Sequence, residues 1–257
     1  MEEKQHKITE EEVQIFNKET APADDGRKKD YFLPASIIVA AVLIAGAIVF
    51  AIIYKGGSPG GSAAQQATST VDVMKAESRD IVLGNANAPV TIVEYSDYQC
   101  PYCGNFFTET QPLIVQNYVN VGKVKMIFRN FPFLGAESIA AAEAAECAAD
   151  QNQGVAYHDA LLKAKHAEEV GGGSENDGSL NRTFFLKLAQ GLNLNMPVFT
   201  SCIDSNKYAS QINQEKATGA AAGVNSTPTF FINGQQVLGA LPYSQFETGI
   251  DSLLKGQ

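Results

Sequence analysis

The stretch that decides the fold is EYSDYQCPYCGNFF, residues 94–107, in which two cysteines enclose a proline and a tyrosine. PVTIVEY, residues 89–95, leads into it, and this apolar run with its β-branched residues predicts a buried strand. Pro101 suits the first position of a helix, where its missing N–H costs least. The sequence therefore predicts that Cys100 lies where a strand gives way to a helix, with Cys103 one turn further on.

A cysteine at the start of a helix has a chemical use. The free backbone N–H groups and the helix dipole favour the thiolate over the thiol and so lower the pKa. Attack by Cys100 on a disulfide, followed by attack of Cys103 on the mixed disulfide, completes thiol–disulfide exchange. This chemistry calls for an exposed Cys100 and a more buried Cys103. It needs no cofactor beyond the Cys100–Cys103 disulfide itself.

Zinc binding and a purely structural bridge are the other interpretations of a Cys-x-x-Cys pair. Zinc commonly takes two close pairs of ligands, whereas Cys147 and Cys202 stand alone in the sequence. The histidines are scattered, and His158 and His166 are expected to be surface or packing residues. A bridge across two residues closes too small a loop to stabilise the fold much. We therefore expect redox chemistry and no metal.

A transmembrane segment is predicted for YFLPASIIVAAVLIAGAIVFAIIY, residues 31–54, which contains no charged residue. As a helix it would be about 36 Å long, enough to cross a bilayer with some tilt. A cleaved signal peptide fits less well, because its apolar core is shorter. Positive charge is concentrated in Arg27–Lys29, before the span, so the N-terminus is expected in the cytoplasm and the rest outside it. The cysteine pair would then face an oxidising space.

The chain is expected to have four parts: a charged cytoplasmic tail (1–30), a transmembrane helix (31–54), a flexible Gly/Ser-rich linker (55–78) and a folded domain (79–257). The net charge of −9 argues against a nucleic-acid partner, because phosphate binding depends on clustered lysine and arginine.

The folded domain is expected to run strand, helix, strand, several helices, hairpin, helix. Strands are predicted at 89–95, 123–131, 227–234 and 235–239, and helices at 137–151, 157–166, 180–190, 197–204, 208–222 and 243–255. The last two strands meet at Asn233-Gly234, a strong hairpin signal.

EYSDYQCPYC together with GVNSTPTFFING, residues 223–234, resembles the DsbA family of thioredoxin-fold oxidoreductases, above all its membrane-tethered bacterial members. The resemblance covers about residues 82–254. It implies an α/β thioredoxin fold with a helical insertion at about 134–222, preceded here by one N-terminal transmembrane helix.

The resemblance also implies roles for particular residues. Cys100 matches the nucleophilic cysteine of the family and Cys103 the resolving one. Thr227-Pro228 matches a loop whose cis proline lies against the redox pair and presents backbone to an extended substrate. A trans proline opening an edge strand is the alternative. Pro101 completes the expected substrate-binding surface, together with the residue that follows it.

Glu94 matches the buried acidic residue of the family and would assist proton transfer at Cys103; a strand residue reaching solvent is the alternative. Tyr102, the last of the expected substrate-binding residues, marks a departure, because strongly oxidising members often carry histidine there. Its uncharged ring leaves the direction of electron flow open. Cys147 and Cys202 are expected to form a structural disulfide in an oxidising space, although buried free thiols also fit.

These observations predict a membrane-anchored, extracytoplasmic thiol:disulfide oxidoreductase that forms disulfides in exported cysteine-containing proteins. The resemblance implies reoxidation by a quinone-linked integral membrane thiol oxidase. A reductase or isomerase of the same fold, and a redox-inert envelope binding module, are the alternatives.

Overall fold

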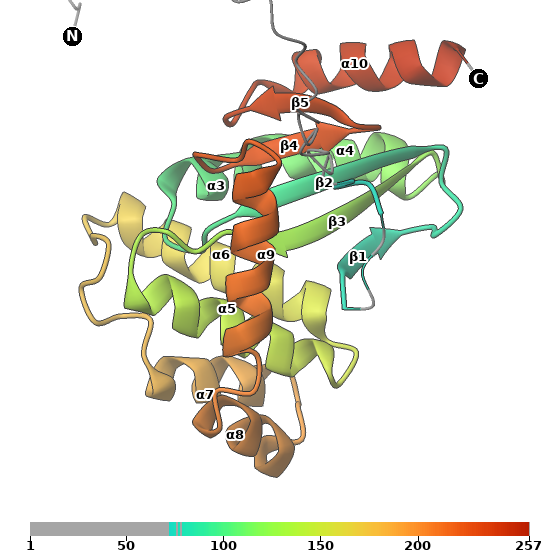
Figure 1. Cartoon of the computed structure of the whole chain (residues 1–257). Coiled ribbons are helices and arrows are strands. Elements are labelled where there is room, and N and C mark those ends of the chain that lie inside the picture. The colour runs from blue at the N-terminus through green and yellow to red at the C-terminus, as the bar shows by residue number, and fades with distance from the viewer. Residues whose placement is uncertain (1–71, 76, 78, 257) are drawn as a thin grey trace, which may run out of the picture. The chain divides into compact units, whose positions relative to one another are not determined.

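The computed structural model describes residues 72–75, 77 and 79–256 (Figure 1). The predicted tail, the predicted transmembrane helix (31–54) and most of the predicted linker lie outside this range. Within it, no helix is long and apolar enough to cross a membrane.

A five-stranded mixed sheet forms the centre of the domain, in the order β1-β3-β2-β4-β5 (Figure 1). Its strands are β1 (Ile81–Gly84), β2 (Val90–Ser96), β3 (Val124–Asn130), β4 (Thr229–Ile232) and β5 (Gln235–Leu238). β2 and β3 are parallel, and the other neighbours are antiparallel. β2 is the central strand, and its β-branched and aromatic side chains suit a position with strands on both sides.

Apolar side chains cover both faces of the sheet. Ile92 belongs to the larger core cluster, which also contains the two cysteines of the redox pair. Val93 and Tyr95 point to the opposite face and join a smaller cluster. Because side chains alternate along a strand, Glu94 shares the face of Ile92 and is directed toward the redox pair.

A long helical segment follows β2 and consists of α3 (Pro101–Asn105), η1 (Phe106–Thr110), α4 (Gln111–Ile114) and η2 (Val115–Val119). Between β3 and β4 lie α5 (Ala136–Ala149), α6 (Gly154–Val170), α7 (Arg182–Gly191), α8 (Met196–Asp204) and α9 (Ala209–Ala221). Figure 1 shows α5 to α8 gathered on one side of the sheet, below it in this view, with α9 running back to β4. This confirms the predicted helical insertion. α10 (Tyr243–Lys255) ends the domain.

The predicted hairpin is confirmed between β4 and β5. Ile232 pairs with Gln235, so the turn consists of Asn233 and Gly234. Both turn residues have positive φ, 46° and 91°. Asparagine and glycine tolerate this backbone conformation best, which is why the dipeptide predicts a two-residue turn.

Among the described residues, some that precede the predicted domain start at Arg79 also pack against the domain. Val73 is buried in the smaller core cluster. Its carbonyl oxygen accepts a hydrogen bond from the buried Arg129 at 2.8 Å, and the same guanidinium pairs with Asp80 at 2.9 Å. The sequence contains only a weak indication of this packing, because Val73 is the one buried apolar residue among the described residues of this segment. β1 was missed for a similar reason, since four residues give almost no pattern.

Candidate active site around the Cys100–Cys103 pair

Cys100 occupies the N-cap of α3, and Pro101 takes the first helical position, as predicted. The backbone at Cys100 is extended, with φ −81° and ψ 117°. Both cysteines are free thiols. The strand β2 ends at Ser96, and a tight turn in which the Cys100 N–H donates to the Asp97 carbonyl (3.0 Å) leads into the helix. The predicted strand-to-helix setting is therefore confirmed.

Burial of the pair differs from the prediction in one respect. Cys103 is fully buried, as expected, but Cys100 is also only 5% exposed, so the expectation of an exposed nucleophile is wrong. The reason is the segment before β4: the Cys100 Sγ donates a hydrogen bond to the Thr227 carbonyl oxygen at 3.3 Å. The Thr227-Pro228 peptide bond is cis, in agreement with the sequence expectation. Only a narrow face of the Cys100 sulfur remains open to a partner.

The two thiols have opposite pKa shifts. A hydrogen bond from Cys103 is the largest influence that lowers the pKa of Cys100, and the Thr227 hydroxyl and backbone N–H groups add to it. Together they outweigh burial and bring the pKa of Cys100 to about 6. Burial, followed by the hydrogen bond to Cys100, raises the pKa of Cys103 well above its ordinary value. At neutral pH, Cys100 is a thiolate and Cys103 keeps its proton.

Glu94 lies on the same side of the sheet and is 1% exposed, so the alternative of a strand residue reaching solvent is wrong. Neither carboxyl oxygen has a partner at normal hydrogen-bond geometry among the described residues. Burial raises the pKa of Glu94 to about 8; the Ser96 hydroxyl opposes this rise, and the charges of Cys100 and Asp159 add to it. Its charge in turn raises the pKa of Cys103. At pH 7, Glu94 is mostly protonated beside the resolving cysteine.

The helical segment that begins after Cys100, α3 together with η1, is called the active-site helix. Helix α6 packs directly on it, a contact that the sequence did not predict. A methyl group on Gly104 would lie 2.6 Å from the Nδ1 atom of His166, so the absence of a side chain there permits the close approach. About two turns earlier, α6 also contributes His158, which stacks on Phe128 with a ring distance of 4.1 Å. The Nδ1 atom of His158 lies 3.0 Å from the Tyr98 hydroxyl. Burial lowers the pKa of His158 to about 3, so it is a neutral packing residue, as expected.

The loop after α6 binds the residue that precedes the nucleophile. Gln99 is fully buried, and its Oε1 atom accepts a hydrogen bond from the Asn176 N–H at 2.6 Å. The buried Lys165 holds the same loop by donating to the Ser174 carbonyl oxygen at 2.8 Å. The sequence analysis assigns no role to residues 171–178, which lie between the helices predicted at 157–166 and 180–190. The amide of Gln99 was the only available signal, and it is not specific.

Tyr102, Phe133 and Val170 are apolar residues exposed to solvent, with exposed fractions of 64%, 43% and 76%. Tyr102 and the exposed Pro101 stand at the start of the active-site helix, where a substrate chain can contact them. Sequence reasoning named these two, whereas it missed Phe133 and Val170. A single apolar residue in a polar loop or at a helix end gives no pattern to detect.

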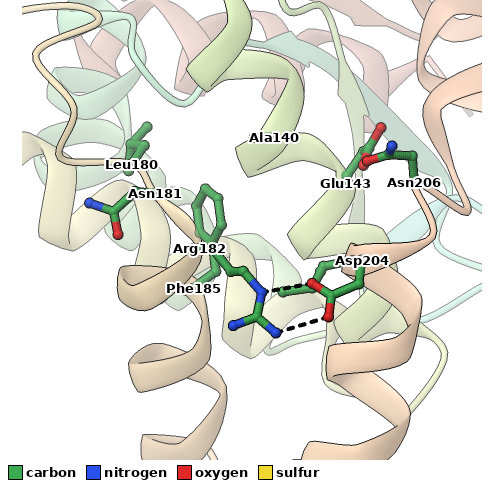
Figure 2. Close-up of a pocket in the computed structure, with 9 residues that line it drawn as sticks. Ala140, Glu143, Leu180, Asn181, Arg182, Phe185, Asp204 and Asn206 are labelled. Atoms are coloured by element: carbon green, nitrogen blue, oxygen red, sulfur yellow. Dashed lines mark hydrogen bonds and ion pairs between the residues drawn. The ribbon is translucent and has the colours of Figure 1, made fainter.

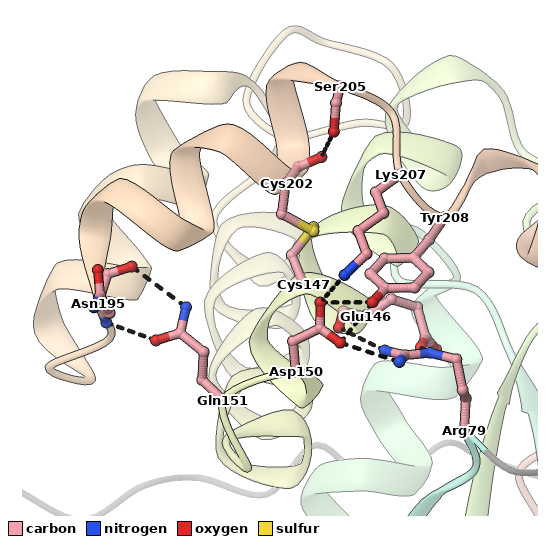
Figure 3. The surroundings of a disulfide bond; sticks show 10 residues. All are labelled: Arg79, Glu146, Cys147, Asp150, Gln151, Asn195, Cys202, Ser205, Lys207 and Tyr208. Atoms are coloured by element: carbon pink, nitrogen blue, oxygen red, sulfur yellow. Dashed lines mark hydrogen bonds and ion pairs between the residues drawn. A yellow bond between two sulfur atoms is a disulfide. The ribbon is translucent and has the colours of Figure 1, made fainter.

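The structural disulfide is present: Cys147 of α5 and Cys202 of α8 are joined (Figure 3). Beside it, Asp150 forms ion pairs with Lys207 at 2.7 Å and with Arg79 at 3.0 Å. The bridge ties two helices of the insertion together and includes none of the residues around Cys100.

A pocket of about 190 Å³ in the insertion is separate from the redox pair (Figure 2). Residues of α5, α7 and α8 line it, and the Arg182–Asp204 ion pair, 2.7 Å long, crosses it. None of the predicted site residues takes part in it.

Fold and site together define a class of protein: a thioredoxin fold with a dithiol at the start of its active-site helix and a helical insertion before the cis proline. The pattern of the family described as Thioredoxin matches residues 76–252. The chain therefore belongs to the thioredoxin family.

A protein sequence and a crystal structure from Bacillus subtilis are both similar to this chain. Disulfide bond formation protein D of Bacillus subtilis is 28% identical over 181 residues, which cover 68% of this chain and 78% of that protein. The crystal structure of oxidised BdbD from Bacillus subtilis has a TM-score of 0.62 at 25% identity and covers 68% of this chain and 93% of that one. These similarities support a DsbA-like thioredoxin-fold disulfide oxidoreductase.

Two Na(+)/H(+) antiporters, from Salinispora tropica and Salinispora arenicola, also match this chain. NhaA 3 of Salinispora tropica is 34% identical over 168 residues, which cover 65% of this chain. The chain spans about a quarter of the length of the two antiporters, 23% and 25%.

Proposed function

We propose that the chain is a membrane-anchored thiol:disulfide oxidoreductase that forms disulfides in exported proteins. The observation that carries this proposal is the asymmetry of the two thiols. Cys100 has its pKa lowered to about 6 at the N-terminus of α3, whereas the pKa of the buried Cys103 is raised. In such a pair Cys100 acts as a thiolate, both when it attacks and when it leaves. Cys103 is the resolving thiol.

The reaction follows from this geometry. A substrate thiolate attacks the Cys100 sulfur of the oxidised pair, and the Cys103 sulfur leaves and takes up a proton. Glu94 supplies that proton, because its carboxyl group is protonated at pH 7 and its charge is coupled to Cys103. A second substrate thiolate then attacks the mixed disulfide and releases Cys100. Thr227, next to Cys100, offers backbone for strand-like pairing with the substrate.

The direction of electron flow is toward oxidation of the substrate. At pH 7 a thiol with its pKa at about 6 is about 90% ionised, and this ionisation stabilises the reduced protein by about 1.4 kcal/mol. For a two-electron couple that corresponds to a potential higher by about 30 mV. A more stable reduced form makes the oxidised form the stronger oxidant, even though Tyr102 provides no positive charge.

The expected surroundings fit this activity. The uncharged residues 31–54 would anchor the domain at the outer side of the cytoplasmic membrane, where exported chains emerge with free thiols. A quinone-linked integral membrane thiol oxidase would return the Cys100–Cys103 pair to the disulfide. Proteins named for disulfide bond formation are among the relatives, which supports an oxidase more than a reductase.

Refolding of reduced ribonuclease by the full chain tests the activity, with Cys100→Ser as the inactive comparison. Equilibration of the Cys100–Cys103 pair with glutathione then places the potential. We expect a value above that of thioredoxin, which is about −270 mV. A potential at or below the thioredoxin value would exclude the oxidase and favour a reductase of the same fold.

A further inference from the structure

One carboxyl group near the nucleophile has no part in the reaction described above. Glu169 lies near the C-terminal end of α6, one turn after His166, and therefore on the face of α6 that packs against the active-site helix. Asp159, seven residues before His166, follows the same face. The active-site helix thus has a row of titratable groups from the insertion along one side.

The surroundings of Glu169 are unusual for a glutamate near a helix end. Its Oε1 atom is buried and makes no hydrogen bond to any residue in the described part of the chain. Four charged or titratable groups act on it electrostatically: Lys165 and Glu168 from α6 itself, Glu175 from the following loop, and Cys100 from the start of α3. Burial raises the pKa of Glu169 to about 7; Lys165 opposes this, and the negative charges, that of Cys100 first, add to it.

We propose that Glu169 is a redox-linked proton acceptor for the Cys100–Cys103 pair: it takes up a proton when the disulfide is reduced and releases it on reoxidation. The inference rests on the proposed function and deepens it. Its physical basis is reciprocity, because a thiolate at Cys100 disfavours a second negative charge on Glu169. In the oxidised protein no thiolate exists, and the carboxylate is disfavoured less.

The balance of the reaction shows what this achieves. A substrate dithiol loses two protons and two electrons and gains one S–S bond, while the Cys100–Cys103 bond breaks and its sulfurs accept the two electrons. One proton goes to Cys103, and Cys100 remains a thiolate. The second proton is shared between the carboxylate of Glu169 and solvent, because a group with its pKa at about 7 is about half protonated in the reduced protein at pH 7. Part of the negative charge that appears on Cys100 is thereby offset by charge lost from Glu169.

The test measures protons taken up per disulfide reduced, from the pH dependence of the glutathione equilibrium of the full chain. The variants are Glu169→Gln and, as a matched control, Glu109→Gln, which removes an exposed glutamate from the active-site helix. Between about pH 6 and 8 we expect wild type and E109Q to take up more protons than E169Q, by at most about a quarter of a proton. That excess corresponds to a rise of roughly half a pH unit in the Glu169 pKa on reduction.

Redox-difference infrared spectroscopy of the wild type provides a second readout that needs neither a variant nor a protein substrate. Reduction with dithiothreitol near pH 7 should add a carboxylic-acid C=O band that E169Q lacks. Equal proton uptake in wild type and E169Q, or no such band, would overturn the inference. A protein that shows the proton signal but fails to refold ribonuclease would instead contradict the proposed function alone.

Discussion

Replacing Glu94 by glutamine should stabilise the protein at neutral pH and slow its chemistry. Glu94 is enclosed between the sheet and the redox pair, and both carboxyl oxygens lack a partner at normal hydrogen-bond geometry. Its pKa of about 8 lies far above the value of about 4.5 that an exposed glutamate has. The unfolded chain can ionise this group at pH 7, whereas the folded protein holds it protonated. Glu94 therefore favours the unfolded state.

The magnitude follows from the two pKa values. Stability that depends on a raised carboxyl pKa is fully present below the unfolded value and is lost as the pH rises toward the folded value. From pH 4.5 to 7 the wild type loses about 3 kcal/mol through this group, at about 1.4 kcal/mol per pH unit. Glutamine does not titrate. Any difference in packing between Glu94 and glutamine is independent of pH and cancels in the comparison.

Urea unfolding of the oxidised full chain at pH 4.5, 5.5, 6.2 and 7 measures the effect. The quantity of interest is the free energy of unfolding of Glu94→Gln minus that of the wild type, which should increase by about 3 kcal/mol over this range. Burial is the largest cause of the raised pKa of Glu94, and the charge of Cys100 is a smaller one. The pKa of Glu94 should therefore stay raised when the cysteines are oxidised. Glu247→Gln, at an exposed position of α10, is the control and should show no trend. A flat difference for Glu94→Gln would refute a buried, protonated Glu94.

Further predictions concern the cysteines and the residue between them. Cys103→Ser, mixed with a protein that carries a disulfide, should accumulate a mixed disulfide seen as a covalent complex on non-reducing gels, because Cys100 attacks that disulfide and no thiol at position 103 can then displace the bound chain. Cys147→Ala with Cys202→Ala should lower the free energy of unfolding by about 4 kcal/mol, since the bridge closes a loop of 55 residues, while the Cys100 thiolate still titrates normally. Tyr102→His should move the ultraviolet absorbance midpoint of the Cys100 thiolate below its wild-type value of about 6, because a nearby imidazolium stabilises the thiolate; an unchanged midpoint would show that this position lies too far from the sulfur to act.

The parts of the site that the sequence predicted are those written into short stretches of chain. Cys100, Pro101 and Cys103 are fixed by one helical turn, and the hairpin by Asn233-Gly234. Local backbone preferences decide such features, so a window of ten residues contains the information. The Thr227-Pro228 contact with Cys100, 127 residues away in sequence, was predictable only by resemblance.

What the sequence did not predict depends on how α6 packs. Amphipathic spacing tells which residues share a helix face but not which element that face meets. Gly104, which admits His166, looks like an ordinary glycine after a cysteine, and Glu169 looks like one more charge in a polar run. The near-complete burial of Cys100 was missed for the same reason, because the covering segment comes from far along the chain.

Several residues of the active site and of the helix packed on it have buried polar atoms without a partner. Glu94, Asp159, His166, Glu169 and Thr227 each have such an atom at normal geometry among the described residues, as do Arg79 and Glu146 beside the Cys147–Cys202 bridge (Figure 3). Groups of this kind destabilise the fold, as Glu94 does by about 3 kcal/mol at pH 7. The Cys147–Cys202 bridge stabilises it by about 4 kcal/mol from within the insertion that carries α6. The bridge and Glu94 therefore make opposite contributions of similar size to the free energy of unfolding at pH 7.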